Sequence, residues 1–471
     1  MKSSWKLAIL VFSFLPLLSA CEGGGGGDDT PPVSTHKWTW VSGSKTVNQA
    51  GTYGTQGTAA PSNVPGAREH AVSWLDSSGK LWLFGGYAYD SAGYIGQLND
   101  LWKFDPTTLE WTWVSGSDTG GQAGIYGTKG TAAPTNVPGA RNRAVSWLDS
   151  SSKLWLFGGL GYFEAGNYGS LNDLWKFDPI TLEWTWVSGS NTGDQAGTYG
   201  TLGTAAPTNV PGARIGAVSW IDPQGILWLF GGYGYDSEGN RDWLNDLWKY
   251  DPTTLEWTWV SGSDTGDQAG IYGTLGTADS LNVPGGRYTA VSWLDSSGIL
   301  WLFGGDGLDS AGSRGDLSDL WKFDPTTLLW TWVSGSNTGD QKGTYGTQGT
   351  AAPTNVPGGR FAAIPWLDSS GKLWFFGGCG YDSGGSRGWL NDLWNFVPTT
   401  LLWTWISGSD IGGRAGTYGT LGTADSSNVP GARYFAVSWI DAQGKLWLFG
   451  GYGSDSAGTG GWLNDLWHLT K

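Results

Sequence analysis

The residues of this chain that could do chemistry stand out because they vary within a sequence that otherwise repeats. A Phe-Gly-Gly triplet recurs every 73 residues, beginning at Phe84, Phe157, Phe230, Phe303, Phe376 and Phe449. An Arg precedes each triplet, and the two residues after that Arg differ in every copy: Glu69-His70, Asn142-Arg143, Ile215-Gly216, Tyr288-Thr289, Phe361-Ala362 and Tyr434-Phe435. Glu69, His70 and Arg143, from adjacent copies, are the nearest candidates for acid and base roles. His70, Arg143, Tyr288, Phe361 and Tyr434 are also ligand-binding candidates. The alternative is that these positions are merely solvated and variable.

A second variable position lies two residues before a repeated Asn or its equivalent, and three of its occupants are Trp243, Trp389 and Trp462. An exposed indole on a rigid loop can bind the apolar face of a sugar ring or a side chain of a partner protein. The alternative is that each Trp folds over its own loop. Trp389 and Trp462 come from neighbouring copies, which favours a shared binding surface.

Two residue types repeat too regularly to indicate one site. Arg occurs in all six copies, at Arg68, Arg141, Arg214, Arg287, Arg360 and Arg433. These Arg residues could form a cationic ring for a carboxylate, but pairing with the repeated Asp100-type carboxylates is the favoured interpretation. An Asp-Ser pair begins at Asp90, Asp236, Asp309, Asp382 and Asp455. Calcium binding at these Asp residues remains possible, although Asp beside Ser and Gly is ordinary turn chemistry.

Metal and redox chemistry find little support in the composition. The chain has three His residues, His36, His70 and His468, at unrelated repeat positions, so one copy cannot assemble a multi-His copper or zinc centre. The two cysteines, Cys21 and Cys379, offer no disulfide framework. We therefore expect no metal site and no cofactor.

Each copy predicts four short strands that position these residues. In the first copy they span residues 68–75, 81–84, 101–104 and 111–114, with polar turns between them. The last copy lacks its fourth strand, whereas an unpaired Trp38-Thr39-Trp40-Val41 precedes the first copy in the correct register to replace it. We therefore predict an all-β, six-bladed propeller that is closed by residues 38–41 in the last blade.

The strand order places two kinds of connection on opposite faces. The connections from fourth to first strand and from second to third strand lie on one face, and the short turns lie on the other. The long connection 115–140 is typical of a functional loop. The loop-rich face is therefore the expected binding face.

These residues resemble the kelch family of β-propellers. The marks are the double glycine Gly85-Gly86 and an aromatic followed after six residues by Trp, as in Phe104 and Trp111. The 73-residue period exceeds the usual kelch length of about 50. The sequence is also similar to the propeller domain of galactose oxidase, but its copper ligands and its cross-linked Cys and Tyr have no counterparts here. Resemblance to the kelch-like periplasmic sialic-acid epimerase implies an enzyme as the alternative function.

The first residues resemble a bacterial lipoprotein signal. Lys2 and Lys6 precede the apolar run 7–18, and Leu18-Ser19-Ala20-Cys21 follows it. The resemblance implies that Cys21 becomes the lipidated first residue; a plain secretory signal is the alternative. We expect a signal peptide over 1–20, a Gly/Asp/Pro-rich tether over 21–35 and the propeller over 36–471.

The charge excludes one class of partner. Without Lys2 and Lys6 the chain carries 24 basic and 41 acidic residues, a formal balance of −17, which repels phosphate backbones and argues against nucleic-acid binding. The sequence thus predicts a monomeric lipoprotein of the bacterial cell envelope, anchored to the outer membrane through Cys21 on its periplasmic or surface side. Its function is non-catalytic binding of protein or carbohydrate ligands; the alternative is a carbohydrate-directed enzyme of epimerase or oxidase type.

Overall fold

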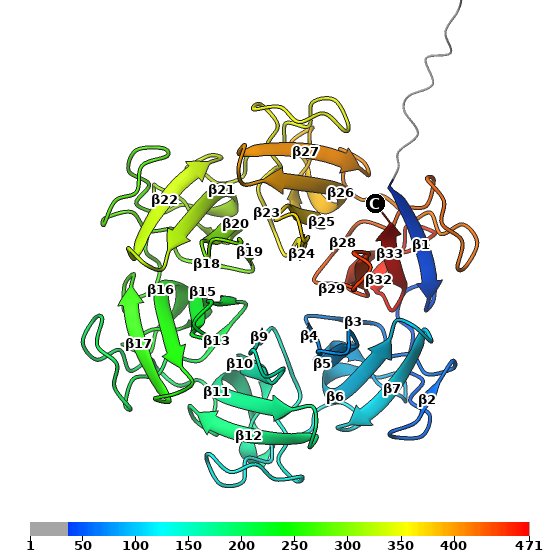
Figure 1. Ribbon diagram of the computed structural model, residues 1–471, viewed down its shortest axis with the longest axis horizontal. Helices are drawn as coiled ribbons and strands as arrows, with labels where there is room; N and C mark the ends of the chain where they lie inside the picture. The colour runs from blue at the N-terminus through cyan, green and yellow to red at the C-terminus, as the bar shows by residue number, and fades with distance from the viewer. Residues whose placement is uncertain (1–35, 471) are drawn as a thin grey trace, which may run out of the picture. The chain divides into compact units, whose positions relative to one another are not determined.

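The computed structural model describes residues 36–470, which form a ring of antiparallel sheets around a central channel (Figure 1). Each sequence copy supplies one radial unit of the ring. The described residues contain one short 3-10 helix, η1 (Glu164–Gly166), and no helix long and apolar enough to cross a membrane. The predicted all-β architecture is confirmed.

The strands of each unit follow one another from the channel outward. The innermost strands come in pairs, which are β3 (Arg68–Glu69) and β4 (Val72–Leu75), β8 (Arg141–Asn142) and β9 (Val145–Leu148), β13 (Arg214–Ile215) and β14 (Val218–Ile221), β18 (Arg287–Tyr288) and β19 (Val291–Leu294), β23 (Arg360–Phe361) and β24 (Ile364–Leu367), and β28 (Arg433–Tyr434) and β29 (Val437–Ile440). The second strands are β5 (Leu81–Tyr89), β10 (Leu154–Tyr162), β15 (Leu227–Tyr235), β20 (Leu300–Leu308), β25 (Leu373–Tyr381), and the divided pair β30 (Leu446–Phe449) and β31 (Tyr452–Ser454).

The two outer positions are occupied in the same way in every unit. The third strands are β6 (Ile95–Asp105), β11 (Tyr168–Asp178), β16 (Arg241–Asp251), β21 (Arg314–Asp324), β26 (Arg387–Val397), and the divided pair β32 (Gly460–Trp462) and β33 (Leu466–Thr470). The outermost strands are β7 (Glu110–Ser115), β12 (Glu183–Ser188), β17 (Glu256–Ser261), β22 (Leu329–Ser334), β27 (Leu402–Ser407) and β1 (Lys37–Ser42). The short strand β2 (Ala59–Ala60) flanks β7.

Ring closure depends on β1, which pairs antiparallel with β33. Trp38 lies opposite Leu469, and Trp40 lies opposite Trp467. Trp38 is only 2% exposed and belongs to the hydrophobic cluster between the last two units. The prediction that residues 38–41 complete the last sheet is confirmed.

The predicted bounds were wrong for the first three strands, since the third begins at Ile95 and not at residue 101. The first strand, expected over 68–75, is interrupted at His70, whose φ of 56° is left-handed. The second strand continues beyond Phe84 to Tyr89 through a bulge at Gly85, so residues 90–94 form a short hairpin turn in place of a long loop. A Cβ at Gly85 would lie 2.8 Å from the carbonyl oxygens of Leu98 and Arg141, which explains the requirement for glycine.

The core is divided among the interfaces between neighbouring units. In one interface, Trp74 and Phe84 of the first unit pack against Phe177 and Trp184 of the second. The repeated Trp residues are therefore packing residues. Because every unit contributes to two such clusters, no unit buries its apolar surface alone.

The long connection between units has a structural task that the sequence analysis did not anticipate. In the connection 116–140, the Gly130 amide donates to the Trp186 carbonyl, and Ala133 bridges Trp184. Asn136 Nδ2 also donates to the Trp184 carbonyl. The connection thus covers the outer edge of β12, where an unpaired strand would invite aggregation. Its length alone is not a sign of ligand binding.

Candidate functional site

A closed belt of backbone hydrogen bonds surrounds the channel at the interruption of each inner strand. Its six residues have φ values between 54° and 59°. Each backbone amide donates to the carbonyl of the equivalent residue in the preceding unit, at 2.7–3.3 Å. The belt residues are His70, Arg143, Gly216, Thr289, Ala362 and Phe435. Left-handed backbone is unfavourable for most residues, so the belt must offset this local strain in five of the six units.

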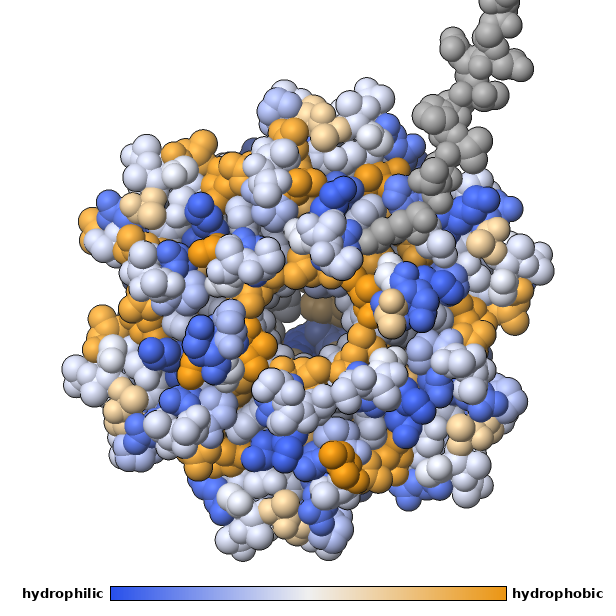
Figure 2. Space-filling view, in the orientation of Figure 1, coloured by the Kyte–Doolittle hydropathy of each residue, from blue (hydrophilic) through white to orange (hydrophobic). Residues whose placement is uncertain are grey.

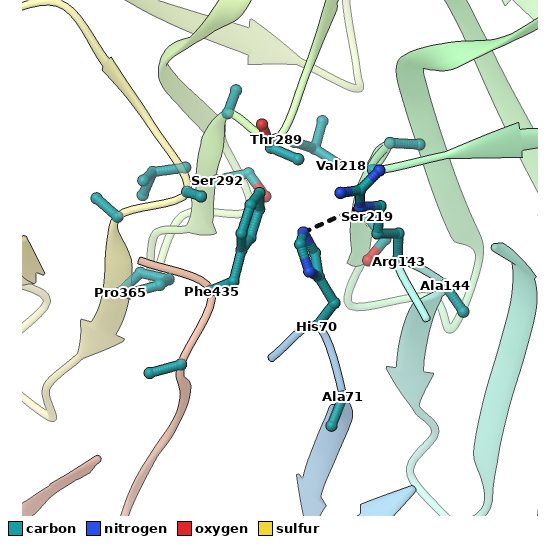
Figure 3. A pocket seen from close by; sticks show the side chains of 17 residues that line it. His70, Ala71, Arg143, Ala144, Val218, Ser219, Thr289, Ser292, Pro365 and Phe435 are labelled. Carbon is teal, nitrogen blue, oxygen red and sulfur yellow. Dashed lines mark hydrogen bonds between the residues drawn. The ribbon is translucent and has the colours of Figure 1, made fainter. Parts of the chain in front are cut away.

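The side chains of the belt make the channel asymmetric. His70, Arg143 and Phe435 are large and come from three consecutive units, whereas Gly216, Thr289 and Ala362 are small and come from the other three. Figure 3 shows His70, Phe435 and Arg143 extending into the centre of the ring. Next to them lies a cavity of about 260 Å³. Hydrophobic surface rims the central opening in the space-filling view (Figure 2).

His70 is held on three sides. Its Nε2 accepts a hydrogen bond from Arg143 Nε at 3.1 Å, and its Nδ1 lies 3.6 Å from Glu69 Oε2. Its ring packs against Phe435 with centroids 3.3 Å apart. Burial lowers the pKa of His70 to about 4, aided by Arg143 and opposed by Glu69, so the imidazole is neutral near pH 7. The structure therefore brings together the three predicted acid and base candidates.

This arrangement does not suit His70 to act as a general base. Its one lone pair, on Nε2, already accepts from Arg143, and the proton on Nδ1 points toward Glu69. His70 Nδ1 and Glu69 Oε2 are buried and form no hydrogen bond within the described residues. The contacts among Glu69, His70 and Arg143 therefore suit orientation of the Arg143 side chain and do not suit proton abstraction by His70.

A second pocket, which we call the mouth pocket, opens on the loop-rich face. It has a volume of about 280 Å³ and is lined by Arg143, Leu160, Ile215, Tyr233, Arg241, Trp243, Tyr288 and Arg314. The pocket lies on this face because Arg241 and Arg314 begin the third strands directly after the hairpin turns. It unites three residues singled out from the sequence, Arg143, Trp243 and Tyr288.

The arginines of the mouth pocket differ in their partners. Arg314 pairs with Asp306 at 3.0 Å and lies 4.2 Å from the ring centroid of Trp243. Arg241 donates to Ser170 Oγ at 3.2 Å and lies over Tyr233, whereas Arg143 donates to His70. Neither Arg143 nor Arg241 forms an ion pair with a carboxylate of residues 36–470. Two cations without anionic partners thus converge beside aromatic rings.

Sequence reasoning missed Arg241, Arg314 and Tyr233. Arg241, Arg314 and Arg387 occupy the first position of the third strand, where the other copies have Ile95, Tyr168 or Gly460. That variation is a signal of the kind that identified Arg143. It could be used only once the position was known to belong to a strand facing the channel mouth.

Comparison with known proteins identifies the family. The family model of the KLHDC2/KLHL20/DRC7 Kelch-repeats domain matches residues 26–261. The chain belongs to this kelch-repeat family. Kelch domain-containing protein 3 from Bos taurus is 26% identical over 236 residues, and the protein of the same name from Homo sapiens is 27% identical over 237 residues. Each match covers 48% of this chain and 44% of the relative, so the similarity spans less than half of either relative's length.

Among solved structures, this kelch propeller is similar to the structure of YjhT. The sequence identity is 16% and the TM-score is 0.49, and the match covers 86% of this chain and 95% of that chain. The resemblance to kelch β-propellers drawn from the sequence is confirmed by the family match.

The other two candidate tryptophans of the kelch propeller, Trp389 and Trp462, pack against tyrosines. Trp462 contacts Tyr87, Tyr89 and Tyr452, and Trp389 contacts Tyr452. Both indoles are half-buried. A Cβ at Gly460 would lie 2.7 Å from Trp389, so the small residue there makes room for that indole. The expectation of freely exposed platforms is therefore corrected, because each of these Trp side chains also packs against the next unit.

Phe361 and Tyr434, the other two candidates, lie deeper at the channel wall. Phe361 is buried and packs edge-on against Tyr434, with centroids 6.0 Å apart. Burial is the main cause that raises the pKa of Tyr434, and the nearby Glu69 adds to it. Phe361 also stacks on Tyr288 of the mouth pocket and lies 5.6 Å from the Arg387 guanidinium, so the aromatic wall continues into that pocket.

The repeated arginines of the kelch units are structural. Arg214 donates from Nη1 and Nη2 to the two carboxylate oxygens of Asp246, at 2.7 Å each. The Tyr199 hydroxyl and Trp248 Nε1 donate to the same carboxylate. The corresponding groups repeat in the other units, and all six Arg side chains are buried. A carboxylate ligand cannot reach them, so the idea of a cationic capture ring is wrong.

The repeated Asp-Ser pairs stabilise hairpin turns. Asp236 Oδ1 accepts from the amides of Glu238 and Asn240, and its Oδ2 accepts from the Gly266 amide. Among residues 36–470, no group of three His, Cys, Asp or Glu side chains is placed to hold a metal ion. Cys379 is buried and unpaired, and Cys21 lies outside the described residues. The predicted signal peptide (1–20) and tether (21–35) also lie outside them.

Proposed function

We propose that this kelch propeller is a non-catalytic binding module whose mouth pocket takes a ligand with an anionic group, in the first instance an acidic carbohydrate. The observation that carries this proposal is the convergence of Arg143 and Arg241, without carboxylate partners, beside Trp243 and Tyr288. The propeller fold supports a binding or scaffold role in general. A carboxylate would supply the missing acceptor, and the aromatic rings would contact the apolar face of a sugar.

The net charge of the chain strengthens this reading. The whole sequence has a formal charge of −15, so the positive charge of unpaired arginines in a pocket is opposite in sign to the net charge of the molecule. Such a site repels cationic ligands locally and concentrates anionic ones. A partner protein that presents an acidic side chain to the same pocket is the other ligand class consistent with this chemistry.

The alternative function, a carbohydrate-directed enzyme of epimerase or oxidase type, has less support. It would depend on His70 with Glu69 and Arg143, and the lone pair of His70 is already used by Arg143. We further propose that the module is exported, lipidated at Cys21 and held at the outer membrane of a bacterial cell envelope as a monomer. The signal-like residues 1–21 support that part of the proposal.

The binding proposal can be tested with a glycan array followed by calorimetry. We expect oligosaccharides that contain uronic or other acidic sugars to bind, and their neutral counterparts to bind at least about tenfold more weakly. Arg241→Gln should weaken acidic ligands about tenfold, and Trp243→Ala should weaken them by a similar factor. Arg414→Gln is the matched control, because Arg414 is an exposed arginine outside the mouth pocket that donates to Ser409.

Two results would count against the proposal. If acidic and neutral glycans bound equally well, the arginines would not determine which ligand the pocket takes. The second result is that no glycan binds, while a pull-down retains a protein partner that is lost on Arg241→Gln. This result would show that the pocket binds an acidic protein surface.

A further inference from the structure

The cavity inside the channel is distinct from the mouth pocket. It runs from the belt along the inner strands toward the short turns, because its lining residues occupy the belt position and the three positions that follow it. Arg143 borders both spaces, and no other residue does. The cavity of about 260 Å³ is not part of the function proposed above.

Small apolar side chains from every unit contribute to the walls of this cavity, beside a set of polar groups. Every unit contributes an alanine, and the fifth unit contributes two; Val218, Val291, Pro365 and Phe435 complete the apolar surface. The Ser219 hydroxyl lies in the wall but donates to the Ser146 carbonyl at 3.1 Å. The Ser292 hydroxyl also lies in the wall. An unbranched hydrocarbon chain suits such a wall.

Two polar side chains of the cavity, Thr289 and Arg143, keep donor groups without an acceptor among residues 36–470. Thr289 Oγ1 is buried and forms no hydrogen bond within the described residues, and Arg143 has no carboxylate partner there. His70 is not among these donors, because its Nε2 accepts from Arg143 and its Nδ1 lies toward Glu69. No Asp or Glu lines the cavity. A group that only accepts hydrogen bonds and carries negative charge, such as a carboxylate, complements this set.

We infer that the channel cavity binds a medium-chain aliphatic carboxylate. The carboxylate lies at the belt, where Arg143 and Thr289 donate to it, and the hydrocarbon chain extends between the alanines toward the turns. A cavity of about 150 Å³ holds benzene, so one of this size has room for about ten non-hydrogen atoms, as in octanoate. Because Gly216, Thr289 and Ala362 are small, their half of the channel stays open, and the hydrocarbon chain occupies this half.

The first test compares head groups on the same hydrocarbon chain, using the full-length wild-type protein and calorimetry. Octanoate should bind with one-to-one stoichiometry, and octylammonium should bind at least about tenfold more weakly because Arg143 repels it. This comparison needs no variant. Equal affinity for octanoate and octylammonium would overturn the inference.

The second test uses variants of Thr289 and Arg143. Thr289→Phe should abolish binding of both octanoate and octanol by filling the open half of the channel. The fold should accept it, because Phe435 occupies the equivalent position with a φ of 56°, close to the 54° of Thr289. Thr289→Val, the matched control of similar size, should weaken octanoate by severalfold and leave octanol unchanged. Arg143→Gln should weaken octanoate about tenfold and spare octanol.

The two sites are separable by crossed measurements. Trp243→Ala should reduce binding of acidic glycans and leave octanoate unaffected, because Trp243 does not line the cavity. Thr289→Phe should do the reverse, since Thr289 does not line the mouth pocket. Octanoate binding that survives Thr289→Phe would overturn this inference and leave the proposed function standing.

Discussion

At the scale of single residues, the buried carboxylates of the repeated Arg–Asp pairs are the most demanding feature of the fold. Asp246 accepts hydrogen bonds from Arg214, Tyr199 and Trp248, and none of its atoms is exposed. Burial and the carboxylate together raise the pKa of Tyr199, so its hydroxyl remains a donor. A buried charge with this many partners is stable only while every partner is present.

We therefore expect Asp246→Asn to lower the free energy of unfolding by about 3–5 kcal/mol, because the substitution leaves the Arg214 charge buried without an anion. Urea denaturation measures the effect. Asp264→Asn, at a partly exposed carboxylate with no side-chain hydrogen bond among the described contacts, should change stability by less than about 0.5 kcal/mol. An equal effect of the two substitutions would contradict the structural role of the pair.

The low pKa of His70 predicts a stability that depends on pH. In the unfolded chain His70 titrates near 6.5, whereas in the folded protein its pKa is about 4. Between these values the unfolded state binds more protons, so the folded state loses stability as the pH falls from about 6.5 to about 4. His70→Gln removes this group, and its Oε1 can still accept from Arg143.

Wild-type protein should therefore lose about 2–4 kcal/mol more than His70→Gln between pH 7 and pH 4. The measurement is the urea midpoint at each pH. His468, whose pKa burial also lowers to about 4, is present in both proteins and cancels from the comparison. Parallel pH profiles for the two proteins would show that folding does not lower the pKa of His70.

At the scale of elements, ring closure rests on one strand from the other end of the chain. β1 pairs with β33, and its Trp38 carbonyl accepts from Asn428 Nδ2. Trp111 holds the same position in the first unit, where its strand follows directly in the chain. Comparing the two tryptophans therefore separates a strand that is held in its sheet by pairing alone from one that is also joined to its sheet through the chain.

Trp38→Ala and Trp111→Ala should each cost about 3–5 kcal/mol, because both remove a buried indole. Only Trp38→Ala should accelerate amide hydrogen exchange across β33, since β1 can then detach from that edge without unfolding the rest of its unit. Hydrogen exchange followed by mass spectrometry distinguishes the two variants. Unchanged exchange in β33 would mean that ring closure does not depend on Trp38.

The sequence was most informative where a pattern repeats without change. The 73-residue period, the four strands and the closing strand could all be predicted, because each is carried by several aromatic residues. The extension of β5 to Tyr89 could not, because glycines at 85 and 86 normally end a strand and here form a bulge. The mouth pocket was predicted only in part, since Arg241 becomes a neighbour of Arg143 only through the pairing of two different units.

At the scale of the whole molecule, six nearly identical units surround a channel with unlike sides. Arg143, Arg241 and Arg314 lie on one side, and Trp389, Trp462 and Tyr452 lie on the other. Repetition thus maintains the fold, while a few positions per unit vary. A ligand with a charged end and an apolar ring matches this division.

The proposed membrane attachment makes a prediction for the whole protein. When the chain is expressed in a bacterium with lipoprotein processing, it should fractionate with membranes and require detergent for release. Cys21→Ser should move it to the soluble fraction. Cys379→Ser is the matched control and should remain with the membranes. Soluble wild-type protein would contradict lipidation at Cys21.

The belt around the channel has one further consequence. Its six hydrogen bonds use only backbone amide and carbonyl groups. The side chain at each belt position can therefore be exchanged without removing a hydrogen bond of the belt. Proline is the exception, because it has no amide hydrogen and cannot adopt a positive φ. The width and polarity of the channel can therefore be changed by substituting one belt residue at a time, while the backbone ring stays the same. This makes the propeller a practical starting point for engineered molecular sieves.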